Sequence, residues 1–236
     1  MGKAAPKPDA ERPAAFFDLD RTLIGINSAF SYISYERKRG QISLFQFARA
    51  SLWMGLYHLS LVDIERAFAE AVRQYRGTHV DELRRITEDF FDQHVTPHFQ
   101  PGAQLALDDH RDRGHPLVLL TASSPYMSEL ATRTWDLDHW LSNRFPTDEK
   151  GYLRGTFERP ICYGPGKVER ARRWAKRNGV DLGASYFYTD SYSDLPMLER
   201  VKYPRVVNPD PRLRRAAERR GWPIEDWSTG RDQAST

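Results

Sequence analysis

The stretch that decides the fold is "AAFFDLDRTLI", residues 14–24, where a short apolar run ends at two aspartates separated by one residue. Consecutive apolar residues of this length are typical of a strand buried on both faces, as in the parallel sheets of α/β proteins. Two carboxylates about 4 Å apart repel by roughly 4 kcal/mol at an effective dielectric constant near 20. A chain that places Asp18 and Asp20 side by side therefore needs a chemical use for them, and we expect a functional site at the carboxyl end of this strand.

Three further apolar runs, at residues 116–120, 185–189 and 204–207, also indicate buried strands. Helical patterns alternate with them: one helix is expected from about Pro125, and another over residues 166–178. This alternation predicts an α/β fold, a Rossmann-like parallel sheet with helices on both faces. In such sheets the ligand site lies beyond the carboxyl ends of the strands.

Polar side chains follow the predicted strand ends. They are Asp18, Asp20, Thr121, Asp190 and Asp194. All of them offer hard oxygen ligands, and neither His nor Cys belongs to the cluster, which favours Mg²⁺. Mg²⁺ typically keeps waters while it binds one or two carboxylates and a substrate phosphate. The sequence therefore predicts a magnesium site at this edge.

Lys167 stands in "GPGKVERA", at the predicted start of a helix. Its ammonium would neutralise a nucleophilic aspartate and hold a phosphate oxygen, and the helix N-terminus adds favourable partial charge. Taken alone, the simpler interpretation is a surface lysine. The functional interpretation depends on the acidic cluster around it.

Four motifs in order, "FFDLDRTLI", "LLTASSP", "GPGKVERA" and "YTDSYSDLPML", resemble those of the haloacid dehalogenase superfamily of phosphatases. More narrowly, the chain resembles the phosphoserine-phosphatase-like branch, whose small helical cap lies between the first and second motifs. The resemblance covers about residues 14–222. A lone D-x-D is weak evidence, whereas four ordered motifs are specific.

The resemblance implies roles that the chemistry supports. Asp18 would attack phosphorus and form an aspartyl-phosphate. Asp20 would protonate the leaving alkoxide and then activate water. Thr121, with backbone N–H groups at Ala122 and Ser123, would bind the phosphoryl oxygens.

The resemblance also implies the metal ligands. Asp190 would bind Mg²⁺ directly, and Asp194 would act through water or by orienting another ligand. The ion would also contact a carboxylate oxygen of Asp18 and the backbone carbonyl of Asp20. Lys167 would complete the catalytic set.

Residues 28–99 are predicted to form the all-helical cap, inserted after the first strand of a core made of residues 14–27 and 100–236. Helical periodicity is clear at residues 62–75 and 80–94. Caps exclude water and contact the rest of the substrate, so we expect specificity to reside here.

The substrate stays open between phosphoserine, histidinol phosphate and other small phosphomonoesters. Phosphoserine phosphatases usually place a Glu shortly after the first motif, but "GINSAF" has no acidic residue. Arg76 is a candidate partner for a substrate carboxylate, and Ser193 stands where the family commonly has Asn. Residues 148–160 are predicted to form a hairpin with turns at Gly151 and Gly155. This hairpin either borders the pocket or serves as a structural arm.

Two other functions remain open. One is a protein that senses a phosphorylated ligand on the same scaffold. The other is a lipid-phosphate phosphatase, since residues 43–61 are apolar almost all round. That segment is interpreted as a buried cap helix, with a dimer interface, a lipid-like substrate or membrane contact as the alternatives.

The composition of the chain indicates which partners and which cellular compartment to expect. The chain has 236 residues, with 35 Lys and Arg against 32 Asp and Glu. This near balance, with the arginines scattered, argues against a nucleic-acid partner. The resemblance implies a small phosphorylated metabolite as the partner. A single cysteine, Cys162, is typical of a reducing compartment such as the cytoplasm. Residues 1–13 are polar and proline-rich and are predicted to be a disordered tail. The expected assembly is a monomer or a homodimer.

Overall fold

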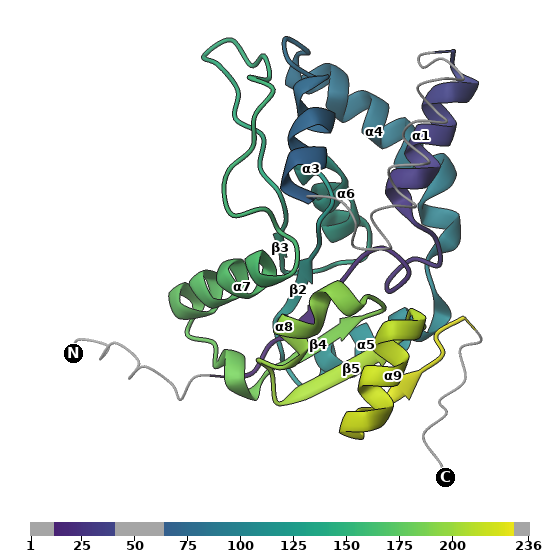
Figure 1. The fold of residues 1–236 in the computed structure, drawn as a ribbon, viewed down its shortest axis with the longest axis vertical. Helices are drawn as coiled ribbons and strands as arrows, with labels where there is room; N and C mark the ends of the chain where they lie inside the picture. Colours follow the sequence, from purple (N-terminus) through teal and green to yellow (C-terminus); the bar gives the residue numbers. More distant parts are fainter. Residues whose placement is uncertain (1–11, 41–63, 229–236) are drawn as a thin grey trace, which may run out of the picture.

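The computed structural model describes residues 12–40 and 64–228, and a six-stranded parallel sheet lies at their centre (Figure 1). The strand order is β3-β2-β1-β4-β5-β6. The strands are β1 (Ala15–Phe17), β2 (Leu117–Leu120), β3 (His139–Leu141), β4 (Tyr186–Thr189), β5 (Tyr203–Val207) and β6 (Ile224–Glu225). The four predicted strands are all present, each within one residue of the expected position.

Helices connect the strands and also form the insertion after β1. They are α1 (Ser28–Lys38), α3 (Ile64–Arg73), α4 (Val80–His94), α5 (Pro101–Asp112), α6 (Pro125–Thr134), α7 (Pro165–Asn178), α8 (Leu195–Leu198) and α9 (Pro211–Arg220). Short 3₁₀ turns are η1 (Thr96–His98), η2 (Leu182–Ala184) and η3 (Tyr192–Asp194).

Successive residues of each strand point to opposite faces of the sheet, and both faces are covered. Phe17 and Leu119 pack with α5 and α6, together with the cap residues Phe90 and Phe91. The preceding strand residue, Phe16, packs with α7, α8 and α9 on the other face. Burial on both sides explains the continuous apolar runs in the sequence and confirms the predicted Rossmann-like arrangement.

The strand register determines where the site lies. Phe17 pairs with Leu119 of β2 and with Tyr188 of β4, both in parallel. The carboxyl ends of these three strands therefore reach the same edge of the sheet. This edge carries Asp18, Thr121 and Asp190.

The cap helices α1, α3 and α4 lie beyond this carboxyl edge (Figure 1). Tyr32 and Tyr35 of α1 pack on Phe90 of α4, with ring centroids 5.2 and 5.5 Å apart. The cap boundaries at residues 28 and 99 stay predictions. The apolar segment 43–61 lies outside the described residues. Within residues 12–40 and 64–228, no helix combines the length and the apolar character needed to cross a membrane.

The predicted hairpin at residues 148–160 is present, but its bounds differ. A bridge between Thr147 and Leu153 joins two arms, and backbone hydrogen bonds run from Asp148 N to the Tyr152 carbonyl at 2.9 Å and from Arg154 N to the Pro146 carbonyl at 3.0 Å, so the first arm begins before residue 148. The segment also pairs with the loop before α4: Gly77 N donates to the Leu153 carbonyl, and Val80 N donates to the Gly151 carbonyl, each at 2.9 Å. The predicted hairpin is therefore present with an earlier first arm, and the loop before α4 pairs along its second arm.

Ordered contacts begin inside the predicted N-terminal tail. Arg12 N donates to the Gly179 carbonyl at 3.2 Å, and Asp181 N donates to the Arg12 carbonyl at 3.1 Å. Arg12 thus lies beside the loop after α7.

Candidate active site

One buried lysine joins two of the predicted carboxylates. Lys167 Nζ donates to Asp18 Oδ1 and to Asp194 Oδ2, each at 2.7 Å. Lys167 is only 3% exposed. Asp18 follows β1, Lys167 lies in the first turn of α7, and Asp194 ends η3. The structure therefore brings three of the four sequence motifs into direct contact.

The start of α7 explains how Lys167 reaches this position. Gly164 has a φ of 49°, in the left-handed region, and the helix then begins at Pro165. At Gly166 a Cβ would collide with the carbonyl oxygen of Ile161. The absence of a side chain there lets the preceding loop fold close against the helix, so Lys167 enters the first turn, where the helix dipole favours anions nearby.

Asp20 is held by the insertion that follows it. Its Oδ1 accepts a hydrogen bond from Ser28 N at 2.9 Å, at the start of α1. Asn27 caps the same helix, because its Oδ1 accepts from Phe30 N at 2.9 Å. Burial raises the pKa of Asp20, while the hydrogen bonds from Ser28 oppose this. The raised pKa suits a group that carries a proton.

The carboxylates of the site carry more negative charge than the single ammonium of Lys167 can balance. Burial raises the pKa of Asp18 to about 7; Lys167 opposes the rise, and Asp194 adds to it. Burial, followed by the charges of Asp18 and Asp194, raises the pKa of Asp190 well above its ordinary value. One ammonium is therefore not enough to keep the whole cluster ionised.

A divalent cation fits this donor set. Asp194 Oδ1 is buried and has no hydrogen-bond partner among the described residues. In the same part of the chain, no group of three or more His, Cys, Asp or Glu side chains is arranged so that these side chains alone could form a metal cage and hold an ion. Mg²⁺ does not require such a cage, because it usually completes its shell with waters and phosphate oxygens.

Thr189 is a site residue that sequence reasoning missed. Its Oγ1 donates to Asp194 Oδ2 at 2.7 Å, beside the Lys167 ammonium. Thr189 is fully buried at the end of β4. A polar residue that closes an otherwise apolar strand was the available signal.

Thr121 begins the turn between β2 and α6. Its backbone N–H donates to the Leu141 carbonyl at 3.0 Å, and its Oγ1 accepts from Ser123 N at 3.2 Å. The hydroxyl proton of Thr121 remains available to a bound oxygen. Ala122 and Ser123 form the turn, and Ser124 then caps α6 by accepting from Met127 N. The predicted phosphoryl-binding turn therefore lies at the same edge as Asp18.

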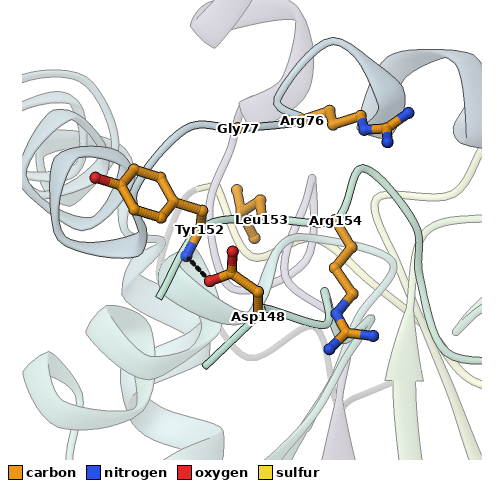
Figure 2. A pocket seen from close by; sticks show the side chains of 6 residues that line it. All are labelled: Arg76, Gly77, Asp148, Tyr152, Leu153 and Arg154. Carbon is orange, nitrogen blue, oxygen red and sulfur yellow. Dashed lines mark hydrogen bonds between the residues drawn. The ribbon is translucent and has the colours of Figure 1, made fainter. Parts of the chain in front are cut away.

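Ser193 lies close to the site, and Arg76 does not line the same part of the molecule. The Ser193 hydroxyl lies 2.8 Å from that of Ser191, in the 3₁₀ turn that ends at Asp194. Arg76 borders a pocket of about 360 Å³ with residues of the 148–154 segment (Figure 2). No residue of the acidic cluster lines that pocket. The predicted role of Arg76 in substrate binding therefore gains no support from its position.

Gln100 is a second residue that the sequence did not reveal. Its Nε2 donates to the Thr22 carbonyl at 2.6 Å, and its Oε1 accepts from Asn208 Nδ2 at 2.8 Å. Its backbone N–H also donates to the Leu23 carbonyl. The residue that enters α5 thus fixes the turn after Asp20, through contacts that no local pattern shows.

Comparison with known proteins identifies the family. The model of the haloacid dehalogenase-like hydrolases matches residues 15–199. The chain belongs to this family. The haloacid dehalogenase-like assignment drawn from the four motifs is therefore confirmed, and the protein is a hydrolase.

Several relatives of this hydrolase have names. It is similar to a phosphoserine phosphatase of Mycobacterium tuberculosis, with 30% identity over 94% of this chain and 73% of the relative. It is also similar to a histidinol-phosphatase of Neisseria meningitidis, with 25% identity over 89% of this chain and 96% of the relative. A crystal structure of a Bordetella pertussis protein of unknown function superposes with a TM-score of 0.83 at 28% identity, covering 92% and 99% of the two chains.

Proposed function

We propose that this haloacid dehalogenase-like hydrolase is a Mg²⁺-dependent phosphatase that acts on a small phosphomonoester through an aspartyl-phosphate at Asp18. The observation that carries the proposal is the buried contact of Lys167 with Asp18 and Asp194, at the sheet edge that also bears Thr121. The phosphatases among the relatives support the same chemistry.

In the first step a carboxylate oxygen of Asp18 attacks phosphorus, and the bond between phosphorus and the leaving oxygen breaks. Asp20 gives its proton to that oxygen, so the product leaves as an alcohol. In the second step Asp20 takes a proton from water, whose oxygen attacks the aspartyl-phosphate. Inorganic phosphate leaves and the Asp18 carboxylate is restored.

The surrounding groups stabilise the charge that moves during both steps. The Thr121 hydroxyl and N–H groups of its turn would bind phosphoryl oxygens. Lys167 holds Asp18 in place and offers positive charge beside the transferring group. Ser28 fixes the side chain of Asp20 through a backbone hydrogen bond.

Mg²⁺ would be held by the carboxylates of Asp18 and Asp190 and the backbone carbonyl of Asp20, with Asp194 acting through a water. When bound, it supplies positive charge that keeps Asp18 ionised and offsets the charge on the phosphoryl oxygens. The raised pKa values of Asp18 and Asp190 and the unpartnered oxygen of Asp194 support this assignment.

The substrate is proposed only as a small phosphomonoester. Asn27, near the place where phosphoserine phosphatases carry a Glu, uses its side-chain oxygen to cap α1. A substrate ammonium would therefore need a different partner. Phosphoserine and histidinol phosphate both remain candidates, in keeping with the names of the relatives.

A phosphomonoester panel tests the proposal. The panel contains p-nitrophenyl phosphate, phosphoserine, histidinol phosphate and a lysophosphatidate, each with Mg²⁺ and with EDTA. We expect turnover that requires Mg²⁺ and falls at least about 10⁴-fold in Asp18→Asn, because the nucleophile is lost. Asp112→Asn, at an exposed position of α5, is the matched control. Absence of turnover across the panel would instead favour the phospho-ligand sensor.

A further inference from the structure

One buried amide side chain joins two of the loops that form the site. Asn143 lies two residues after β3 and is 1% exposed. Its Nδ2 donates to the Ala122 carbonyl at 2.6 Å, and its Oδ1 accepts from Cys162 N at 2.8 Å. Both ends of the amide are therefore engaged with backbone groups of other segments.

These two partners belong to the loops that would hold the phosphoryl group. Ala122 lies between Thr121 and Ser123, in the turn after β2. Cys162 belongs to the segment that leads into α7 and to Lys167. Asn143 thus connects the phosphoryl-binding turn to the segment that delivers the lysine.

The chemistry of the partners fixes how the amide is oriented. A carbonyl accepts only from the NH₂ end, and a backbone N–H donates only to the oxygen end. The bonds that the 161–167 segment makes within itself, such as Gly166 N to the Tyr163 carbonyl and Lys167 N to the Gly164 carbonyl, shape the loop. They do not attach it to the turn after β2. The Leu141 carbonyl accepts from both Thr121 N and Cys162 Sγ at the end of β3, and the two bonds of Asn143 add a side-chain link between the same two segments.

We propose that Asn143 is a positioning residue that sets the separation between the Thr121 turn and the Lys167 segment. The proposal rests on the phosphatase function proposed above. In that function both loops contact the transferring phosphoryl group. A small error in their separation therefore weakens binding of the transition state more than binding of the substrate.

Asn143→Asp is the most informative variant. It keeps the shape and the acceptor for Cys162 N, but it replaces the donor to Ala122 with an oxygen that the carbonyl repels. We expect kcat for p-nitrophenyl phosphate to fall about 10- to 100-fold, and KM to change less than about threefold.

Two further readouts separate positioning from a purely structural role. Orthovanadate adopts the geometry of the transition state, so its affinity should fall in parallel with kcat, whereas the affinity for inorganic phosphate should change little. The loss of kcat should also be the same for p-nitrophenyl phosphate and for an alkyl phosphate, because the leaving group is not affected.

Asn178→Asp is the matched control, since Asn178 Nδ2 donates to the Trp174 carbonyl at the exposed end of α7. If Asn143→Asp unfolds, Asn143→Ala is measured below its unfolding temperature, with kcat expressed per folded molecule by circular dichroism. Wild-type kcat in the folded variants, or equal loss of vanadate and phosphate affinity, overturns the positioning role. A wild-type protein that hydrolyses no phosphomonoester overturns the proposed function itself, and the positioning role with it.

Discussion

The cluster around Lys167 illustrates how single residues determine the properties of this site. Burial alone would lower the pKa of the lysine, but the charges of Asp18 and Asp194 raise it above its ordinary value. The ammonium therefore stays protonated and compensates two buried carboxylates. Removing one partner of such a buried network leaves uncompensated charge, which costs more than the network gained by forming.

Lys167→Met is expected to lower the free energy of unfolding by about 3–5 kcal/mol at neutral pH, because Asp18 and Asp194 lose their buried cation. Urea denaturation measures this change. Lys176→Met, at an exposed position of the same helix, is the control and should shift stability by less than about 0.5 kcal/mol. Equal stability of the two variants would contradict the view that Lys167 compensates the carboxylates.

Cys162 gives a second prediction at this scale. It is fully buried, and burial raises the pKa of its thiol to about 12. Because the thiolate is the reactive form, iodoacetamide should leave the folded protein unmodified under conditions that fully alkylate the unfolded chain. Mass spectrometry of the two samples measures this difference. Rapid alkylation of the folded protein would show that the loop before α7 opens readily.

At the scale of elements, regular segments were predicted well and short ones were not. The helices Val80–His94 and Pro165–Asn178 match their predicted patterns, since an apolar stripe repeats over several turns. The strands His139–Leu141 and Ile224–Glu225 were missed, because three and two residues are too few to show a period. The hairpin near Asp148 is present, but its further pairing with the loop before α4 was not predicted, because that loop is distant in the sequence.

The residues of the site also divide into those that a local sequence pattern reveals and those that it does not. Asp18, Lys167 and Asp194 stand in local motifs that the sequence displays. Gln100 and Asn143 are found only through hydrogen bonds to segments about 80 and 20 residues away, which no local pattern reveals. The residues to which we assign chemistry stand in local motifs, whereas the residues that hold them in place could not be predicted.

The loop that enters α7 gives a prediction at the element scale. Gly166→Ala should destabilise the protein by about 1–3 kcal/mol and lower kcat, because the new Cβ collides with the Ile161 carbonyl and shifts Lys167. Thermal unfolding and the p-nitrophenyl phosphate assay measure the two effects. Gly25→Ala is the control, since its Cβ would meet only ordinary contacts at 3.8 and 3.9 Å. Similar behaviour of the two variants would contradict this explanation.

At the scale of the whole molecule, one face of the sheet carries a polar cluster that joins α5 and the loop after it to β4. His110 of α5 is fully buried; its Nε2 lies 2.9 Å from Tyr188 Oη and its Nδ1 lies 2.9 Å from His115 Nδ1. Burial, followed by the charge of His115, lowers the pKa of His110 to about 4. The folded protein therefore holds this imidazole neutral.

This lowered pKa makes the stability depend on pH. The unfolded chain binds a proton at His110 near pH 6.5, whereas the folded protein does so only near pH 4. The unfolded state therefore takes up more protons between these values, and stability falls as the pH is lowered through this window, by up to about 1.4 kcal/mol per pH unit. His110→Gln should show a shallower fall in urea denaturation over the same window. The exposed His98→Gln should keep the wild-type slope, and a wild-type slope in His110→Gln would refute the assignment.

The central claim for the whole molecule is that the chain folds so that Asp18 receives the phosphoryl group. Acid quenching of Asp20→Asn during reaction with p-nitrophenyl phosphate and Mg²⁺, followed by peptide mass spectrometry, tests this most directly. Since we propose that Asp20 activates the water that clears the intermediate, we predict that one phosphoryl group accumulates on the peptide containing Asp18 and is absent from Asp18→Asn. Phosphate release by an active enzyme with no phosphoryl group on that peptide, or with the group on another residue, would contradict the account.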